Sequence, residues 1–262
     1  MFQNHQDNHS FDDIRAPSLW LLLLETRIVP EMGAYYLWKK ALETFAPHGS
    51  HPVVVLPGFG TTDASTLPLR RLLIRLGYEV YGWDQGRNLG MRPPLRKRLL
   101  KRIENLSTVY GKKVSLVGHS LGGIFARELA KDAPEFVRQV ITMGSPMSGP
   151  PQANNIETIF HLFNPHNKAT VNLETLKKRR IPPPVPSTSI FTRTDGIVAW
   201  QGACEMLTPL TENIEVIGSH SGLCFNPMAL YVVAERLAQP EGEWRPFERT
   251  LLKKIIFPNP HR

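Results

Sequence analysis

Short apolar runs alternate with segments of helical periodicity along most of the chain. Apolar runs without polar alternation are typical of parallel strands that are covered on both faces. Six such runs predict strands at residues 51–56, 78–83, 114–117, 137–143, 187–192 and 213–217. Apolar positions at helical spacing predict helices at residues 67–76, 93–110, 123–130 and 227–237. This order predicts an α/β fold, with about six mostly parallel strands flanked by helices.

The region before the first strand has a different pattern. Ser18 is a suitable cap for a helix that begins at Leu19, and a second helical piece spans residues 31–45. We therefore expect an N-terminal helical arm at residues 1–50 and one α/β domain at residues 51–262. The Leu and Trp side chains of the arm either pack on that domain or lie in a membrane interface.

One long segment interrupts the alternation of strands and helices. Residues 150–186 have apolar positions at helical spacing and end in a proline-rich, stiff stretch. Connections of this length are usually functional or disordered. We expect a lid insertion here, over the ends of the strands. The apolar lid residues expected to contact substrate are Ile156, Phe160 and Phe163.

The sequence Gly118-His119-Ser120-Leu121-Gly122 joins a predicted strand to a predicted helix. It fits the pattern G-x-S-x-G, in which a serine occupies a sharp and strained turn. Side chains two residues before and after that serine would collide, so glycine is needed at both positions. The following helix directs its first backbone N–H groups toward an anion beside Ser120. Ser120 is therefore the candidate nucleophile, and His119 should pack beside the turn.

A serine hydroxyl needs a general base, and that base needs an orienting carboxylate. Beyond residue 132 the only aspartate is Asp195, and the histidines beyond it are His220 and His261. Because Asp195 and His220 both follow predicted strands, they should meet Ser120 at the carboxyl edge of the sheet. We expect a Ser120, Asp195, His220 triad, with Glu205 and Glu212 as fallback acids.

Acyl transfer also needs donors for an oxyanion. The backbone N–H of Leu121, the residue after the serine, is one expected donor. The first strand ends in a glycine-rich turn, which makes the N–H of Phe59 the expected second donor. Phe59 follows the first predicted strand, Trp83 ends the second, and both are apolar, so both are expected beside a medium or long acyl chain.

At this point the chain resembles α/β-hydrolases, most of all bacterial triacylglycerol lipases and related esterases. The matching segments are VVVLPGFG (53–60), VGHSLGG (117–123), TDGIV (194–198) and GSHSGL (218–223). The resemblance covers residues 51–150 and 187–237, although Pro57 stands where many members have histidine. It implies a serine hydrolase that cleaves lipid or other acyl esters through an acyl-enzyme, without a cofactor.

Three alternatives to ester hydrolysis remain open. The same triad serves acyltransferases and thioesterases, and a non-catalytic lipid-binding relative would share the fold.

In similar lipases a disulfide links the loops of the acid and the base, which here would pair Cys204 with Cys224. Two free thiols are the alternative. No cluster of residues has the spacing of metal ligands, so no metal is expected.

Charge adds a question about partners. The formal net charge is +8, and residues 92–113 contribute eight basic side chains and one acidic one, 8 − 1 = +7. Such a block binds nucleic acid or anionic lipid, or is a solvated helix face. Without a nucleic-acid motif we expect no nucleic-acid partner, and we keep a peripheral contact with an anionic membrane. The first 18 residues do not resemble a signal peptide, which predicts a cytoplasmic protein.

Overall fold

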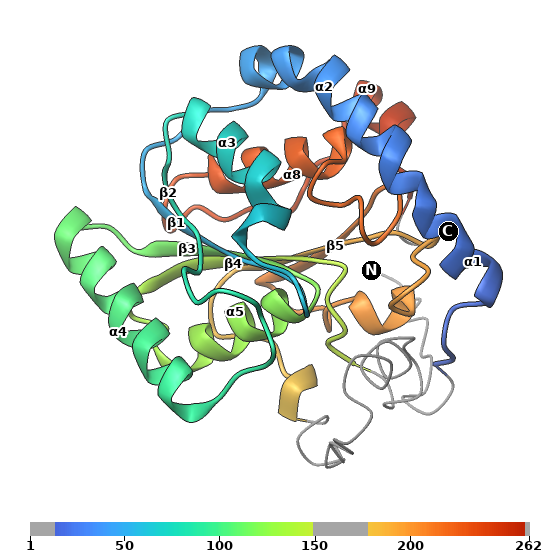
Figure 1. Cartoon of the computed structure of the whole chain (residues 1–262). Helices are drawn as coiled ribbons and strands as arrows, with labels where there is room; N and C mark the ends of the chain where they lie inside the picture. Colours follow the sequence, from blue (N-terminus) through green and yellow to red (C-terminus); the bar gives the residue numbers. More distant parts are fainter. Residues whose placement is uncertain (1–13, 149–177, 260–262) are drawn as a thin grey trace, which may run out of the picture.

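The computed structural model describes residues 14–148 and 178–259. Its centre is a six-stranded sheet in the order β2-β1-β3-β4-β5-β6, and every neighbouring pair is parallel (Figure 1). The predicted α/β class is confirmed. The strands are β1 (Pro52–Leu56), β2 (Glu79–Tyr81), β3 (Val114–His119), β4 (Val137–Met143), β5 (Ser187–Phe191) and β6 (Thr211–Glu215).

Most strands differ from their predicted bounds by one or more residues, and hydrogen bonding gives the reason for the shifts in two of them. The second strand ends at Tyr81 because the N–H groups of Trp83 and Asp84 donate to the Asp63 carboxylate, at 2.9 and 3.0 Å. The last strand begins two residues early because Thr211 already pairs with Ser187 of β5.

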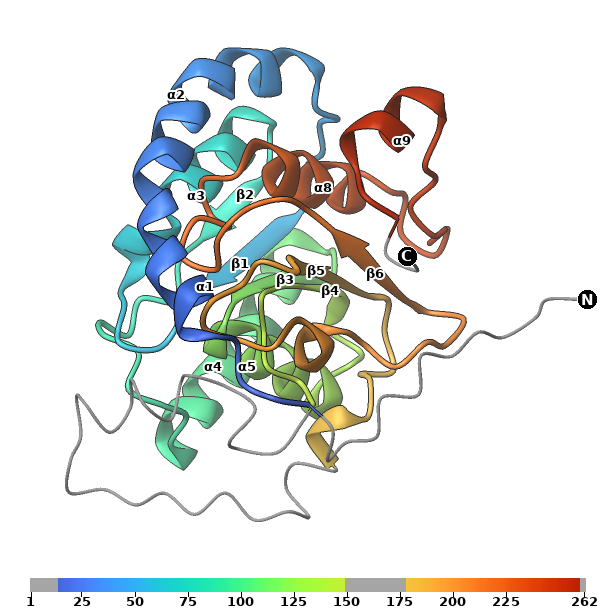
Figure 2. The same cartoon turned by 90° about the vertical axis from the view of Figure 1, so that its right-hand side faces the viewer.

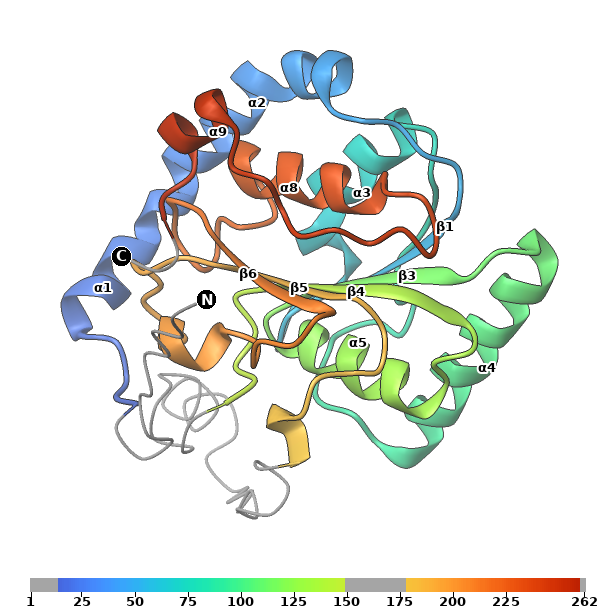
Figure 3. The ribbon, with the colours of Figure 1, turned by 180° about the vertical axis from the view of Figure 1, so that it is seen from behind.

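Helices cover both faces of the sheet, as the alternation predicts. One face carries α2 (Ile28–Phe45), α3 (Leu67–Arg75) and α8 (Pro227–Leu237), and the other carries α4 (Pro93–Tyr110) and α5 (Leu121–Asp132) (Figure 3). A cluster of buried apolar side chains lies between each helical layer and the sheet. Beyond α8 the chain forms a short helix, α9 (Leu251–Ile256), after which Phe257 packs into the cluster beneath α2, α3 and α8.

The described part of the N-terminal region contains three helices in succession. These are α1 (Leu19–Leu23), a short 3₁₀ helix η2 (Leu24–Arg27) and α2. The side chain of Ser18 caps α1 by accepting from the N–H of Leu21, at 3.4 Å. Figure 2 shows these helices running along one side of the molecule, and Tyr35 and Leu42 join the core. No helix in the described ranges is long and apolar enough to span a membrane.

Candidate active site

Ser120 occupies the turn between β3 and α5 in a strained conformation. Its φ and ψ are +51° and −122°, a backbone region that residues with a Cβ rarely adopt. A Cβ at Gly118 would lie 2.3 Å from the backbone of Gly123, and one at Gly122 would lie 2.3 Å from the carbonyl oxygen of Leu56. The two flanking glycines are therefore required by close approach, which is the geometry predicted for the motif.

Asp195 and His220 form a buried hydrogen-bonded pair. Nδ1 of His220 lies 2.7 Å from Oδ2 of Asp195, and each residue is 3% exposed. The other carboxylate oxygen of Asp195 accepts from the N–H groups of Ile197 and Val198, at 2.8 and 2.7 Å. Both oxygens of the carboxylate are thus held, so its direction toward the imidazole is fixed by the loop that follows β5.

The pKa of His220 is raised by its charged neighbours. Burial acts to lower it, because an apolar surrounding disfavours the imidazolium. The charge of Asp195, the hydrogen bond from Nδ1 and the charge of Glu25 together outweigh burial, so the net direction is upward. An imidazole with this environment can accept a proton and is stabilised while it holds one.

Backbone contacts bring the serine turn close to the His220 loop. The N–H of Ser120 donates to the carbonyl of Met143 at 2.8 Å, and a Cβ on the next residue, Gly144, would lie 2.9 Å from Nδ1 of His220. His119 packs beside the turn, with Nε2 at 3.0 Å from the His220 carbonyl oxygen. Burial lowers the pKa of His119 to about 3, so this imidazole stays neutral.

The turn after β1 lies against the serine. A Cβ at Gly58 would be 3.3 Å from Cβ of Ser120, which places the next residue, Phe59, at the rim of the same turn. The turn is held by Asn88, a fully buried residue that the sequence reasoning missed. Its side-chain amide donates to the carbonyl of Pro57 at 2.7 Å, and its backbone carbonyl accepts from the N–H of Gly60 at 2.7 Å. Phe59 and Leu121 are both partly exposed.

Trp83, expected to contact substrate, has a different position. It is 1% exposed and packs in the core between the sheet and α4, where its Nε1 donates to the carbonyl of Gly86 at 2.8 Å. Trp83 is therefore a core residue, and the substrate contact expected of it is not supported.

The expected lid residues and the fallback acids remain to be placed. Ile156, Phe160 and Phe163, like the lid over most of residues 150–186, lie outside the described residues. The fallback acids are engaged elsewhere, Glu205 with Arg127 and Glu212 with Arg236.

The two cysteines are free thiols in the structure. Cys224 is buried and Cys204 is partly exposed. Burial raises the pKa of each thiol to about 12, which leaves both protonated at neutral pH. The disulfide that the lipase resemblance suggested for this pair is therefore not present.

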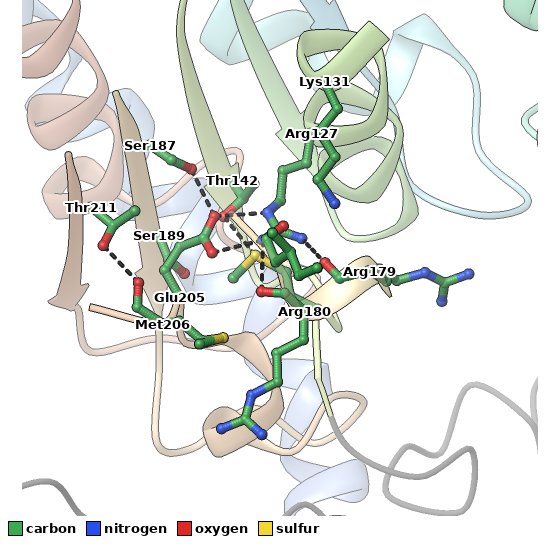
Figure 4. Close-up of polar contacts among 12 residues, drawn as sticks. Arg127, Lys131, Thr142, Arg179, Arg180, Ser187, Ser189, Glu205, Met206 and Thr211 are labelled. Carbon is green, nitrogen blue, oxygen red and sulfur yellow. Dashed lines mark hydrogen bonds and ion pairs between the residues drawn. The ribbon is translucent and has the colours of Figure 1, made fainter. Parts of the chain in front are cut away.

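The helix that follows Ser120 is anchored by a buried ion pair (Figure 4). Arg127 of α5 donates from Nε and one terminal nitrogen to Glu205, both at 2.7 Å, and the two side chains are fully buried. Arg127 also donates to the carbonyls of Arg179 and Ile181, at 2.5 and 3.2 Å. Arg127 therefore links the segment before β5 to α5, the helix that begins directly after Ser120.

Three charged residues of the arm contact the acid and base loops, and the sequence reasoning missed them. Glu25 accepts from Gly196, His220 and Ser221, and Glu31 accepts from Ser219. Arg27 donates to the carbonyls of Thr194 and Gly218, at 2.9 and 3.3 Å. The available signal was composition, because Glu25, Arg27 and Glu31 are the only charged residues between positions 18 and 37.

Comparison with known proteins agrees with this fold. Residues 85–203 match the family described as PGAP1-like alpha/beta domain. A triacylglycerol lipase of Pseudomonas fragi is 38% identical over 64 residues, which are 24% of this chain and 22% of that lipase. The similarity to this relative is therefore local.

Solved structures of lipases and esterases share the architecture. Aspergillus fumigatus lipase B has a TM-score of 0.55 and 16% identity, over 74% of this chain and 54% of that one. Naproxen esterase (carboxylesterase NP) of Bacillus subtilis has a TM-score of 0.51 and 12% identity, over 74% and 86%. The chain spans about half the length of the fungal lipase. It has the α/β-hydrolase fold, and its similarities are to lipases and esterases.

Proposed function

Because the chain has a lipase- and esterase-like α/β-hydrolase fold, we propose that it is a serine hydrolase that cleaves carboxylic esters through an acyl-enzyme. The observation that carries the proposal is the buried Asp195–His220 pair, 2.7 Å apart, beside a serine held at positive φ between β3 and α5. These groups follow the carboxyl ends of β3, β5 and β6, three parallel strands of one sheet, and sites form at this edge in such sheets.

In the proposed reaction His220 is the general base. Its Nε2 takes the proton of the Ser120 hydroxyl while Oγ attacks the ester carbonyl, and Asp195 stabilises the imidazolium that forms. The protonated imidazole then gives its proton to the leaving alcohol as the carbon–oxygen bond of the ester breaks. Water repeats the sequence on the acyl-enzyme, which releases the carboxylic acid and restores the Ser120 hydroxyl.

The oxyanion donors of this proposal are the backbone N–H groups of Leu121 and Phe59. Leu121 is the first residue of α5, whose N-terminal N–H groups have no partner within the helix. The close approach of Gly58 to Ser120 supports a donor from the turn after β1. Each such donor lowers the barrier by about 3 kcal/mol in comparable sites.

The proposed substrate is an ester of a lipid or another acyl group, with an apolar acyl chain. The lid proposed for residues 150–186 would cover that chain through Ile156, Phe160 and Phe163, and deletion of residues 153–180 should then raise turnover of short soluble esters relative to long ones. An unchanged chain-length profile in that deletion variant would exclude the lid role.

We also propose a peripheral contact with an anionic membrane, made by the arm. Its outward face is apolar, with Leu19, Leu23, Val29 and Leu37 exposed by 75, 64, 70 and 83%. The charged residues within this stretch point inward to the acid and base loops. On α4, in contrast, several basic side chains have local partners, such as Arg96 with Asp132 and Lys101 with Glu104.

The test of the hydrolase proposal is turnover of p-nitrophenyl esters with two to sixteen carbons, by the wild type and by Ser120→Ala. A rate that depends on Ser120 supports the proposal, and the preferred chain length separates a lipase from an esterase. Acyl transfer to added alcohols or thiols in place of hydrolysis would favour the transferase alternative. Absence both of turnover and of fluorophosphonate labelling at Ser120 would favour a non-catalytic lipid-binding protein.

A further inference from the structure

Glu25 joins the N-terminal arm to two loops that are far away in sequence. Its Oε1 accepts from the N–H of Gly196, the residue after Asp195, at 2.9 Å, and from the N–H of His220 at 3.0 Å. Its Oε2 accepts from the N–H of Ser221 at 2.9 Å. One carboxylate therefore binds the backbone of the acid loop and the backbone of the base loop at the same time.

The Glu25 carboxylate is buried and is held by specific backbone donors. The residue is 9% exposed, and its three backbone donors hold the pKa of the carboxyl below its usual value although burial acts to raise it. The arm also lies directly on the acid loop, because a Cβ at Gly196 would be 2.3 Å from the carbonyl oxygen of Leu21. A buried carboxylate without these donors would be strongly disfavoured, so arm and loops fix each other.

We propose that Glu25 is a positioning residue, which holds the Asp195 and His220 loops in register so that docking of the arm aligns the acid–base pair. This inference rests on the proposed hydrolase function. The two loops are also joined directly, because Nδ1 of His220 forms a hydrogen bond with the Asp195 carboxylate. Glu25 instead fixes the backbones from which both side chains extend, where a displacement of about 1 Å can lower a rate on the order of 10²-fold.

The charge of Glu25 gives the proposal a signature that packing alone would not produce. The charged and titratable groups around His220 are Asp195 on the loop after β5, His119 on β3, and Glu25, Arg27 and Glu31 on the arm. Asp195 and Glu25 favour the imidazolium. Removing the charge at position 25 should therefore lower the pKa of His220 and move the acid limb of kcat/KM to lower pH.

The experiment compares Glu25→Gln, Glu25→Asp and Glu43→Gln in the full chain, with a soluble p-nitrophenyl ester. Glu43 is the matched control, because it lies on the same arm and its ion pair with Arg75 does not involve the loops. We expect Glu25→Gln to lower kcat on the order of 10²-fold, with KM within about twofold and the acid limb at lower pH. Glu25→Asp keeps the charge and should retain more activity and the wild-type limb, and Glu43→Gln should match the wild type.

Two results would overturn the positioning role. One is a kcat within twofold of wild type in Glu25→Gln, with an unmoved acid limb. The other is an equal loss in Glu25→Gln and Glu25→Asp with unmoved limbs, which would indicate only a structural contribution. If Glu25→Gln does not fold, Gly196→Ala decides, since its methyl group pushes the arm away while the Glu25 carboxylate remains. A normal kcat in folded Gly196→Ala, or failure of that variant to fold as well, would count against the proposal.

A second readout separates this inference from the proposed function. In Ser120→Ala protein the His220 imidazole can be titrated by NMR without any turnover, with and without Glu25→Gln. A lower His220 pKa in the double variant supports the electrostatic link between the arm and the base even if no ester is hydrolysed. An unchanged pKa removes that link even if the wild type is an efficient hydrolase.

Discussion

Nδ1 of His220 lies 2.7 Å from the Asp195 carboxylate, in a site from which water is largely excluded. The pair raises the pKa of His220, so the neutral imidazole needed as a base should form only above the usual value of about 6.5. We therefore expect the acid limb of kcat/KM to have its midpoint above that pH, as measured with a soluble ester. His119 contributes no limb there, since its pKa is lowered to about 3.

Asp195→Asn tests the same relationship from the other side. The variant removes the charge that stabilises the imidazolium, so the acid limb should move to lower pH and kcat should fall roughly 10⁴-fold.

The stability of the protein should also depend on pH through the His220–Asp195 pair. Because the folded pKa of His220 is raised, its contribution to the free energy of unfolding is complete below about pH 6.5 and is lost as the pH rises through the folded value. That slope, measured by urea unfolding, should flatten in Asp195→Asn.

The conformation of Ser120 predicts that two substitutions abolish activity equally but differ in their effect on stability. Both Ser120→Ala and Ser120→Gly should lose essentially all ester hydrolysis. Glycine tolerates a φ of +51° without the strain that a Cβ introduces, so Ser120→Gly should be more stable than Ser120→Ala by about 1 kcal/mol. Urea unfolding of the two variants measures the difference. Equal stabilities would mean that the turn holds no strain, and wild-type activity in either variant would remove Ser120 from the proposed mechanism.

Features set by residues close together in the sequence could be predicted, and features set by contacts between distant residues could not. Ser120, Asp195 and His220 could be singled out because the motif is local and few aspartates and histidines follow it. Trp83 was assigned to the substrate from its place at the end of a predicted strand, but its burial comes from packing against α4, which no local pattern marks. Glu25 reaches a backbone 195 residues further along, and no periodicity or motif marks such a contact.

The buried pair of Arg127 and Glu205 should matter far more to stability than an exposed pair of the same chemistry. Arg127→Met leaves the fully buried Glu205 without its cation, which should lower the free energy of unfolding by roughly 3–5 kcal/mol. Arg96→Met is the matched control, since Arg96 and Asp132 form a similar two-bonded pair with side chains 42% and 27% exposed. That change should lower stability by less than about 1 kcal/mol. Similar losses in the two variants would contradict the argument from burial.

The apolar outward face of the arm predicts where a lipid surface would be met. Arg15, which precedes α1, and Lys40, within α2, are exposed cations of the arm, which favours a surface of anionic lipid. Leu23→Glu and Leu37→Glu should each weaken flotation of Ser120→Ala protein with phosphatidylglycerol vesicles, because a charge must then enter the interface. Val109→Glu is the matched control, since Val109 is 77% exposed on α4.

The alternative surface for such a contact is the basic face of α4. If that face binds the vesicles, Arg96→Gln with Lys97→Gln and Lys101→Gln should abolish flotation, and the arm variants should float like the wild type. Hydrolysis of a soluble ester should be unaffected by Leu37→Glu in either case, because Leu37 is 83% exposed and points away from the loops that Glu25 and Glu31 bind. Flotation that survives both arm substitutions would therefore place the contact outside the arm.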